Sequence, residues 1–302
     1  MKKCRVCKNK AIIYMPHHRL ALCKDHFNEW FEKYTEKTIK EFKMFTKKDK
    51  ILVAISGGKD SLALWYVLRK LGYKADGLYI HLGIGEYSER SKEKVYKFAE
   101  KIGGNVIIVD LKEEVATIPE LVKISSREAC SVCGLVKRYN FNKVAKEKCY
   151  NVVATGHNLD DEASALLANV LNWNEKYLGR KYPVLEEEEG FVRKVKPFCK
   201  FTEKETALYA LLNGIDFIEE ECPFSEDATS VFYKEILNKI EERSPGTKLR
   251  FYLDYLRKIY PKFKKEEDKK NLKPCKVCGH PTMGEICPVC RLKEKAGAFL
   301  AG

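Results

Sequence analysis

The sequence has no apolar run that approaches the roughly 18–20 residues of a membrane span, and its first residues lack a signal-peptide pattern. These absences argue against a membrane protein, and we expect the chain to work in the cytoplasm with no membrane partner. Disorder is not expected either, since 45% of the residues are hydrophobic. The 302 residues are enough for two domains, or for one domain with appendages.

Acidic residues are in deficit, with 43 Asp and Glu against 56 Lys and Arg, which gives a formal net charge of +13. A basic excess favours a polyanionic partner, because each Lys or Arg placed beside a phosphate releases a counterion. A thermophile-like surface of solvated and paired Lys and Glu is the other explanation. Charge alone therefore favours a nucleic acid as partner without establishing one.

Twelve cysteines need an explanation other than disulfides, because cytosolic thiols stay reduced. Two sets have the spacing of tetrahedral zinc sites. One is Cys4-x-x-Cys7 with Cys23-x-x-His26, although His17 and His18 compete with His26 for the fourth position. The other is Cys275-x-x-Cys278 with Cys287-x-x-Cys290. Closed four-ligand sites leave no open position for chemistry, so we expect two structural Zn²⁺ ions, one near each end of the chain.

Short apolar runs alternate with helical stretches in the middle of the chain. The runs at residues 51–55, 78–80, 105–111 and 151–155 are typical of buried parallel strands. Helices are expected at residues 62–68, 88–102, 133–148 and 160–171. Strands separated by helices predict the α/β class with a doubly wound parallel sheet, here carrying small zinc-binding modules at both termini.

The predicted domain boundaries follow these patterns. We expect a zinc finger at residues 1–28, an amphipathic linking helix at 29–48, the α/β domain at 49–220, a helical extension at 221–268 and a zinc ribbon at 269–302. Finer segments are a charged, irregular or β-rich link at 182–200, helical segments at 203–213 and 230–260, and a Lys/Glu-rich linker at 262–273.

Ser56-Gly57-Gly58-Lys59-Asp60-Ser61 follows the first apolar run and opens a helix, where unpaired backbone N–H groups favour a phosphate. Its two glycines let the backbone approach phosphate oxygens, its serine hydroxyls can donate hydrogen bonds, and Lys59 adds a positive charge. The run has neither the G-x-x-x-x-G-K-S/T nor the G-x-G-x-x-G spacing. A plain glycine turn is the structural alternative.

The run resembles the SGGxDS signature of the PP-loop ATP pyrophosphatases, which cleave ATP between its α and β phosphates. Ala154-Thr155-Gly156-His157-Asn158-Leu159-Asp160-Asp161-Glu162 resembles a second motif of that family. The resemblance implies that residues 56–61 bind the pyrophosphate of ATP, and that the backbone of Ala54, Ile80 and Gly156 frames the nucleotide. It also implies that Asp161 lies near the reacting phosphate or its Mg²⁺. A structural role is favoured for His157.

Five cysteines remain outside the zinc sets. Cys130 and Cys133 begin a predicted helix, where a thiolate is favoured, and Cys222 precedes a proline, as is common at iron–sulfur sites. Three thiolates can hold a [4Fe–4S] cluster and leave one iron free for a non-protein ligand. Cys149 and Cys199 are interpreted as thiols without a function.

The whole pattern resembles the tRNA 2-thiolation enzymes. It combines zinc modules at both ends, the SGGKDS run, and the set of Cys130, Cys133 and Cys222. Two kinds of member share this plan, a T-loop ribothymidine 2-sulfurtransferase of thermophiles and a wobble-uridine thiolase, and the Lys/Glu-rich composition favours the first. The cytidine thiolase usually lacks both zinc modules. The resemblance implies tRNA and a ubiquitin-like thiocarboxylate sulfur carrier as partners, and a homodimer is a further arrangement to test.

The resemblance implies a mechanism in which the C2 carbonyl of a tRNA uridine is adenylated by ATP and its oxygen is then replaced by sulfur. Lys59, Lys137 and Asp161 are the expected catalytic residues, with Lys137 stabilising the leaving charge unless it is only a solvated helix lysine. Two alternatives stay open: a cluster-free thiolase that carries a persulfide on Cys130 or Cys222, and a zinc-finger nucleic-acid-binding protein whose nucleotide site only regulates binding. Candidate contacts to tRNA phosphates are Lys248, Arg250, Arg257 and Lys258.

Overall fold

The computed structural model describes residues 2–188, 190–224, 229–263 and 272–300. Within these residues, six strands form a central sheet in the order β5-β4-β3-β6-β8-β7. Its strands are β3 (Lys50–Ile55), β4 (Lys74–His81), β5 (Val106–Asp110), β6 (Val152–Thr155), β7 (Val184–Leu185) and β8 (Arg193–Val195). All neighbours pair in parallel except β7, which runs antiparallel to β8 at one edge. The predicted doubly wound parallel sheet is confirmed, with this antiparallel edge strand added.

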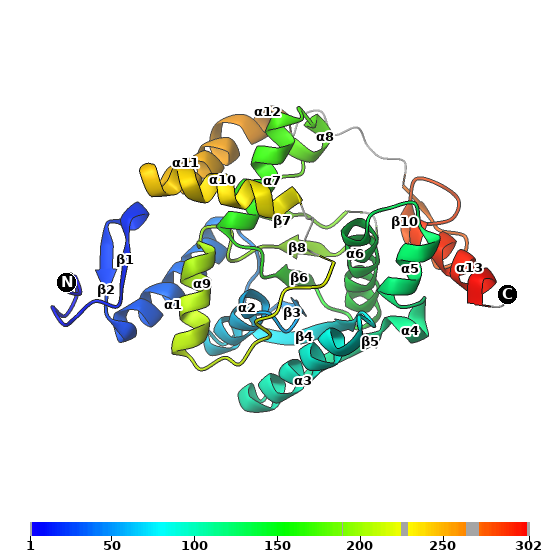
Figure 1. Ribbon diagram of the computed structural model, residues 1–302, viewed down its shortest axis with the longest axis horizontal. Helices are drawn as coiled ribbons and strands as arrows, with labels where there is room; N and C mark the ends of the chain where they lie inside the picture. The colour runs from blue at the N-terminus through cyan, green and yellow to red at the C-terminus, as the bar shows by residue number, and fades with distance from the viewer. Residues whose placement is uncertain (1, 189, 225–228, 264–271, 301–302) are drawn as a thin grey trace.

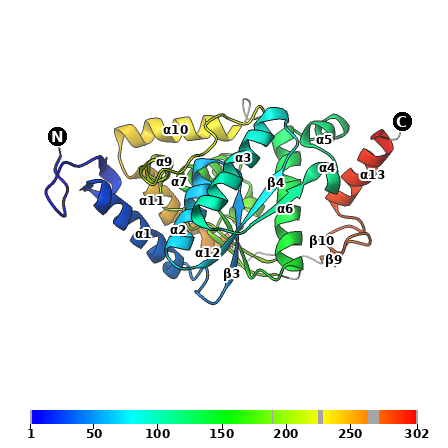
Figure 2. The same ribbon diagram turned by 90° about the horizontal axis from the view of Figure 1, so that it is seen from below.

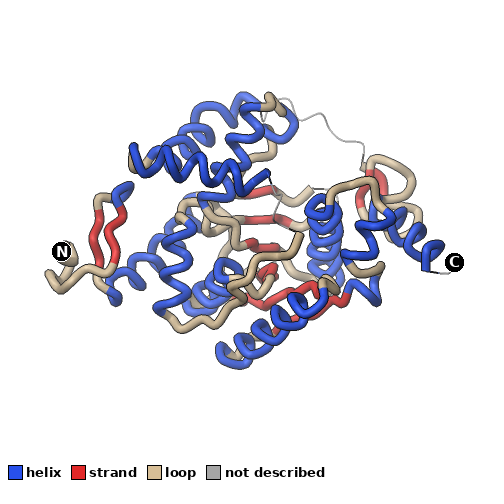
Figure 3. Tube along the Cα trace, viewed as in Figure 1, coloured by secondary structure: helices blue, strands red, loops and turns tan. Residues whose placement is uncertain are grey.

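Both faces of the sheet are buried, because side chains alternate between two hydrophobic cores along each strand. On β3, Ile51, Val53 and Ile55 belong to one core. Leu52, from the same strand, belongs to the other core. Figure 3 shows the strands of this sheet at the centre of the molecule, with helices on both sides.

The helices of the α/β unit fall into two groups. Those that contribute to the core with Ile51 are α2 (Lys59–Lys70), α3 (Gly85–Ile102), α7 (Leu159–Leu171) and α9 (Glu203–Leu212). Those on the core with Leu52 are α4 (Leu111–Glu114), α5 (Ile118–Ile124) and α6 (Ala129–Glu147). Short α8 (Glu175–Leu178) follows α7. Every helix between two parallel strands can thus bury its apolar side on the sheet.

The two cysteine-rich modules lie at opposite ends of the molecule (Figure 1). The first consists of a hairpin of β1 (Ile13–Met15) and β2 (Leu20–Leu22), linked by the 3₁₀ turn Pro16–His18 and followed by α1 (Lys24–Glu41). The second consists of β9 (Lys273–Pro274), β10 (Pro281–Thr282) and α13 (Pro288–Leu300), which packs on α5 and α6. The linking helix predicted for residues 29–48 therefore starts earlier, inside the first module, and ends earlier, at Glu41.

The helical segment predicted for residues 230–260 is wrong as one continuous unit. It comprises α10 (Thr229–Arg243), α11 (Thr247–Asp254), the π-helical turn Tyr255–Ile259 and α12 (Tyr260–Phe263). Pro245 and Gly246 interrupt it, and Gly246 has a positive φ of 91°, which a side chain would resist. Figure 2 shows α10 running across the molecule above α9 and α7. Most of the linker predicted at residues 262–273 lies outside the described residues.

None of the described helices combines the length and the apolar character needed to cross a membrane.

Candidate functional site

The two motif segments meet at the centre of the sheet. Strands β3 and β6 are neighbours although the chain visits β4 and β5 between them, so their carboxyl ends flank the point where the strand order reverses. In open α/β sheets such a point forms a ligand crevice. A Cβ on Gly156 would lie 2.9 Å from the backbone nitrogen of Ser61. Only glycine lets the loop after β6 approach the start of α2 so closely.

The loop before α2 is held in shape by its own serines. The hydroxyl of Ser61 accepts from the backbone N–H of Ser56 at 3.1 Å and donates to the carbonyl of Gly58 at 3.0 Å. Gly57 has a φ of 82°, and a Cβ there would lie 3.0 Å from the carbonyl oxygen of Ser91. The loop therefore presents backbone N–H groups at the N-terminus of α2, as a phosphate requires. Ala54 and Ile80 lie near the ends of β3 and β4, beside it.

Charged side chains surround the loop. The Lys59 ammonium lies 2.7 Å from Glu203 and 3.3 Å from Asp60, and the hydroxyl of Thr206 donates to Asp60. Lys234 of α10 lies 2.5 Å from Asp161 and 3.5 Å from Glu203. Glu203 and Lys234 were missed in the sequence, because nothing local distinguishes them from other surface charges.

Asp161 has two contacts at the start of α7. Its carboxylate accepts from the backbone N–H of Asn158 at 3.0 Å, which completes a capping box, and it also pairs with Lys234. About 27% of the side chain is exposed, so a ligand can reach it. His157 is exposed and its ring contacts the hydroxyl of Thr155 at 2.8 Å.

Cys133 and Cys222 pack against the core that contains Leu52, and Cys130 contacts Phe224, two residues after Cys222. Cys130 and Cys133 lie in the first turns of α6, and the Cys130 thiol donates to the carbonyl of Phe224 at 3.3 Å. Burial raises the pKa of Cys130, as do the neighbouring thiols of Cys133 and Cys222, whereas Lys137 lowers it. The backbone N–H of Ile218 donates to the carbonyl of Gly57 at 2.9 Å. This bond connects the segment that leads to Cys222 with the phosphate loop, residues 56–61.

These three thiols do not form a compact ligand group of the kind that binds one ion. Among the described residues, the groups whose ligand atoms all lie within 4.8 Å of one another do not include them. A cluster bonds each thiolate to a different iron and so holds the sulfurs further apart than a single zinc ion does. Three cysteines suit an iron–sulfur cluster, whereas a structural zinc ion takes four ligands.

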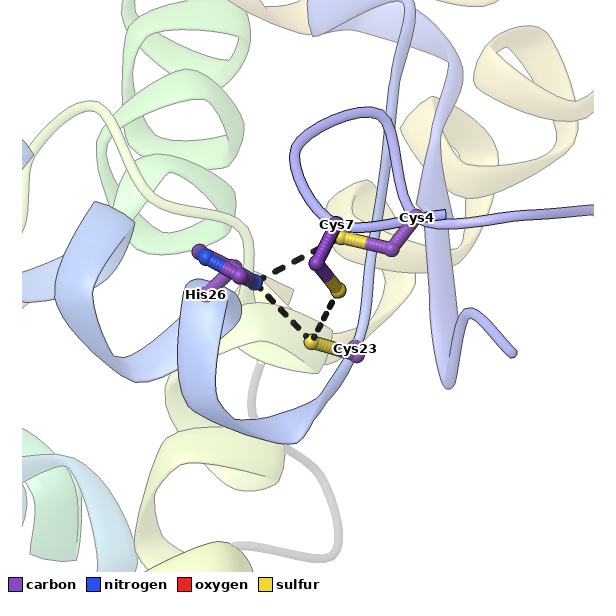
Figure 4. A group of neighbouring side chains, drawn as sticks. All are labelled: Cys4, Cys7, Cys23 and His26. Carbon is purple, nitrogen blue, oxygen red and sulfur yellow. Dashed lines mark hydrogen bonds between the residues drawn. The ribbon is translucent and has the colours of Figure 1, made fainter. Parts of the chain in front are cut away.

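The N-terminal module brings Cys4, Cys7, Cys23 and His26 together (Figure 4). The Cys23 sulfur lies 3.1 Å from Nδ1 of His26 and 3.7 Å from the Cys7 sulfur. Burial alone would raise the pKa of Cys4, but backbone N–H groups, that of Cys7 foremost, lower it to about 6. A thiolate is therefore favoured, as zinc requires.

His17 and His18 lie apart from these cysteines. They form a separate group with Glu205 of α9, and His17 Nε2 lies 2.9 Å from the Glu205 carboxylate. Burial lowers the pKa of His18 to about 4. The contact fastens the hairpin of the N-terminal module to α9.

The C-terminal module brings Cys275, Cys278, Cys287 and Cys290 together. The Cys275 sulfur accepts from the backbone N–H of Cys287 at 3.2 Å, and the Cys287 sulfur lies 3.7 Å from that of Cys278. The ring of His280 packs 4.8 Å from that of Tyr139, so the module rests on α6, the helix that carries Cys130 and Cys133.

Of the basic residues expected to contact tRNA, Lys248 is wrongly assigned. Only 4% of it is exposed, and its ammonium lies 2.5 Å from Asp160 and 2.7 Å from Asn238. Arg250 and Arg257 instead line a cleft of about 370 Å³ between α11 and the N-terminal hairpin, together with Arg19 and His17. Lys258 pairs with Asp254 at 2.9 Å on the surface.

Asp160→Asn is expected to lower the free energy of unfolding of the zinc-loaded protein by about 3–5 kcal/mol, because it leaves the Lys248 ammonium buried without a counterion. Asp254→Asn breaks the exposed pair with Lys258 and should cost about 0.3–0.5 kcal/mol. Urea unfolding of both variants provides the comparison. Equal effects would show that the buried pair is not structural.

Three parts of the chain match known families. Residues 3–28 match the N-terminal LIM domain of the 2-thiouridine synthetase TtuA, residues 28–229 match the PP-loop domain, and residues 272–291 match the Cys4 zinc finger domain of RecR. The PP-loop match therefore covers more than half of the chain.

Relatives and solved structures resemble the chain over nearly its full length. It is 50% identical to the tRNA-5-methyluridine(54) 2-sulfurtransferase of Thermus thermophilus, over 96% of this chain and 90% of that protein. It is 46% identical to the protein of the same name from Thermotoga maritima, over 97% and 96%. The U34-tRNA thiolase NcsA from Methanococcus maripaludis, solved with its [4Fe–4S] cluster, has a TM-score of 0.80 at 27% identity, over 97% of this chain and 96% of that one.

Proposed function

The chain belongs to the PP-loop family of tRNA-5-methyluridine(54) 2-sulfurtransferases, and from that premise we propose that it thiolates 5-methyluridine in the T loop of tRNA. ATP activates the C2 carbonyl of the base, and sulfur then replaces the carbonyl oxygen. The observation that supports this most is the convergence of three segments. The phosphate loop lies against Gly156, in the loop between β6 and α7. It also accepts a hydrogen bond from Ile218, in the segment that precedes Cys222.

The residues of the crevice support an adenylation step. Backbone N–H groups at residues 56–61 and the ammonium of Lys59 hold the pyrophosphate of ATP. The C2 oxygen of the base attacks the α-phosphorus, and the bond from that phosphorus to pyrophosphate breaks. Mg²⁺ would be held by Asp161 together with phosphate oxygens, because this ion binds through one or two carboxylates and its substrate's phosphates. The protein's part is orientation and charge neutralisation.

A [4Fe–4S] cluster would be held by Cys130, Cys133 and Cys222, and when bound it would supply the sulfur-binding position. Sulfide would form a bond to C2 as the C2–O bond breaks, and AMP would leave with the former carbonyl oxygen. Lys137 lies one helical turn after Cys133, and its charge acts on Cys130. We assign it to stabilising negative charge on the departing AMP.

The remaining cofactors and partners follow from this assignment. Two structural Zn²⁺ ions would occupy the Cys4, Cys7, Cys23 and His26 site and the Cys275, Cys278, Cys287 and Cys290 site. tRNA is the substrate, and a ubiquitin-like protein with a C-terminal thiocarboxylate is the proposed sulfur carrier. We place the reaction in the cytoplasm. A homodimer is part of the proposal and is testable by light scattering.

Thiolation of a wobble uridine is the second candidate. It is supported by the likeness to the U34-tRNA thiolase NcsA, which the chain resembles at lower identity than the two T-loop enzymes.

Mass spectrometry of nucleosides distinguishes these functions. tRNA would be incubated anaerobically with cluster-reconstituted enzyme, Mg-ATP and sulfide. We expect 5-methyl-2-thiouridine, and none from a tRNA whose T-loop target is replaced by cytidine. A 2-thiolated wobble uridine would support the second candidate, and the absence of any thiolated nucleoside would contradict both.

Arg250→Ala and Arg257→Ala are each expected to weaken tRNA binding and to reduce the slope of log K against log salt by about 1. The cleft they line carries an excess of positive charge, since Asp254 already pairs with Lys258. Lys97→Ala on α3 is the control, because this exposed lysine pairs with Glu93 away from the cleft. Binding curves at several salt concentrations provide the test, and unchanged slopes would remove these arginines from the interface.

A further inference from the structure

Glu203 holds two lysines at once beside the phosphate loop. One carboxylate oxygen, Oε1, lies 2.7 Å from the ammonium of Lys59, and the other, Oε2, lies 3.5 Å from the ammonium of Lys234. Lys59 is the first residue of α2, whereas Lys234 comes from α10, which packs on α7. A single carboxylate thus bridges two cations from different elements, as a phosphoryl group of a nucleotide would.

The Glu203 carboxylate has no other described role in the fold. The N-cap of α9 is Thr202, and the reciprocal capping contact comes from Glu205, so Glu203 is not needed to start the helix. Its backbone N–H, rather than its side chain, makes the contact to Asp160. A carboxylate in this position therefore serves the two lysines.

The three side chains are partly exposed, unlike those of a structural core pair. About 40% of the Glu203 side chain is exposed, with 25% of Lys59 and 26% of Lys234. The nearby pair of Asp160 and Lys248, in contrast, is 6% and 5% exposed. A bound anion can therefore reach both ammonium groups by displacing a side chain that is already partly in water.

The charges of the group are maintained at neutral pH. Burial alone would raise the pKa of Glu203, but the contacts with Lys59 and Lys234 lower it. Burial alone would lower the pKa of Lys234, but Asp161 foremost raises it. The site thus contains two cations whose counterions are Asp60, Asp161 and Glu203.

We propose that Glu203 occupies the place of a phosphoryl group in the nucleotide-free enzyme, and that Lys234 is a second pyrophosphate-binding lysine that α10 supplies. The inference rests on the proposed function and extends it. When Mg-ATP binds, the β and γ phosphates would replace Glu203 between the two lysines, and the Asp161 carboxylate would be available to hold the metal. Glu203 is then a competitor of the substrate, and Lys234 is a ligand of it.

Substitutions at these two positions are expected to act in opposite directions. Glu203→Gln removes the competing charge and should tighten binding of Mg-pyrophosphate and of a non-hydrolysable ATP analogue several-fold. Lys234→Ala removes a charged contact and should weaken both about tenfold. Glu235→Gln and Lys239→Ala, at exposed positions of α10, are the matched controls and should leave both affinities unchanged.

Isothermal titration of the full-length, cluster-reconstituted protein without tRNA provides the test. If Glu203→Gln weakens binding or leaves it unchanged, or if Lys234→Ala has no effect while the wild type binds both ligands, this inference is overturned and the proposed function stands. A wild-type protein that binds neither the analogue nor pyrophosphate would overturn both. Melting temperatures identify any variant that loses affinity by unfolding.

Discussion

Alanine at Cys130, Cys133 or Cys222 is expected to lower tRNA thiolation by more than about 100-fold while tRNA-dependent pyrophosphate release continues. Even residues that only support metal ligands typically cost 10–100-fold when changed, so loss of a ligand should cost more. None of the three cysteines belongs to the phosphate loop, residues 56–61, so we expect ATP binding and adenylation to continue without them. The variants should also lose iron and visible absorbance after anaerobic reconstitution.

Cys149→Ala is the matched control for these variants. Cys149 is exposed, as Cys130 is, but it follows the opposite end of α6 from Cys130 and Cys133. It should retain full activity, iron and colour. If an iron-free preparation is fully active and only Cys130 or Cys222 is essential, the persulfide alternative replaces the cluster.

Asp161→Asn is expected to lower both pyrophosphate release and thiolation by about 10²–10³-fold, the usual cost of removing one electrostatic contact to a transition state. An asparagine can still accept from the backbone N–H of Asn158, so the start of α7 should be preserved. The missing element is the negative charge that would hold Mg²⁺ at the α-phosphate.

Measuring both pyrophosphate release and thiolation distinguishes the effect of Asp161→Asn from that of the cysteine variants. With Asp161→Asn, pyrophosphate release and thiolation should fall together, and iron content should stay normal. Glu235→Gln is the control, since it removes an exposed carboxylate from α10 without touching the crevice. Thiolation lost with normal pyrophosphate release would assign Asp161 to the sulfur-transfer step instead.

Local patterns were sufficient to predict four strands of the central sheet and the two cysteine modules. Buried parallel strands are short apolar runs, and β3 is such a run over Ile51–Ile55. Zinc ligands are close in sequence at each half of a site, so their spacing is visible without a structure. The break at Pro245-Gly246 was missed, although a Pro-Gly pair is a signal that should have ended the helix.

Ion pairs between distant segments could not be predicted from the sequence. Lys248 was interpreted as a candidate contact to tRNA phosphates, but it is buried and pairs with Asp160, 88 positions away. Glu203 and Lys59 are 144 positions apart. Whether a charged residue is solvated, structural or part of a site depends on such partners, which only the fold brings together.

The central claim is tested most directly by following where the C2 oxygen of the base goes. If the C2 oxygen is adenylated, it leaves in AMP, and no oxygen from water enters that phosphate. The reaction would be run in ¹⁸O-labelled water and the AMP analysed by mass spectrometry against the amount of thiolated nucleoside. We predict unlabelled AMP in equal amount to the thiolated base. AMP that carries solvent ¹⁸O in proportion to thiolation would show that ATP is hydrolysed by water, and would contradict activation of the carbonyl.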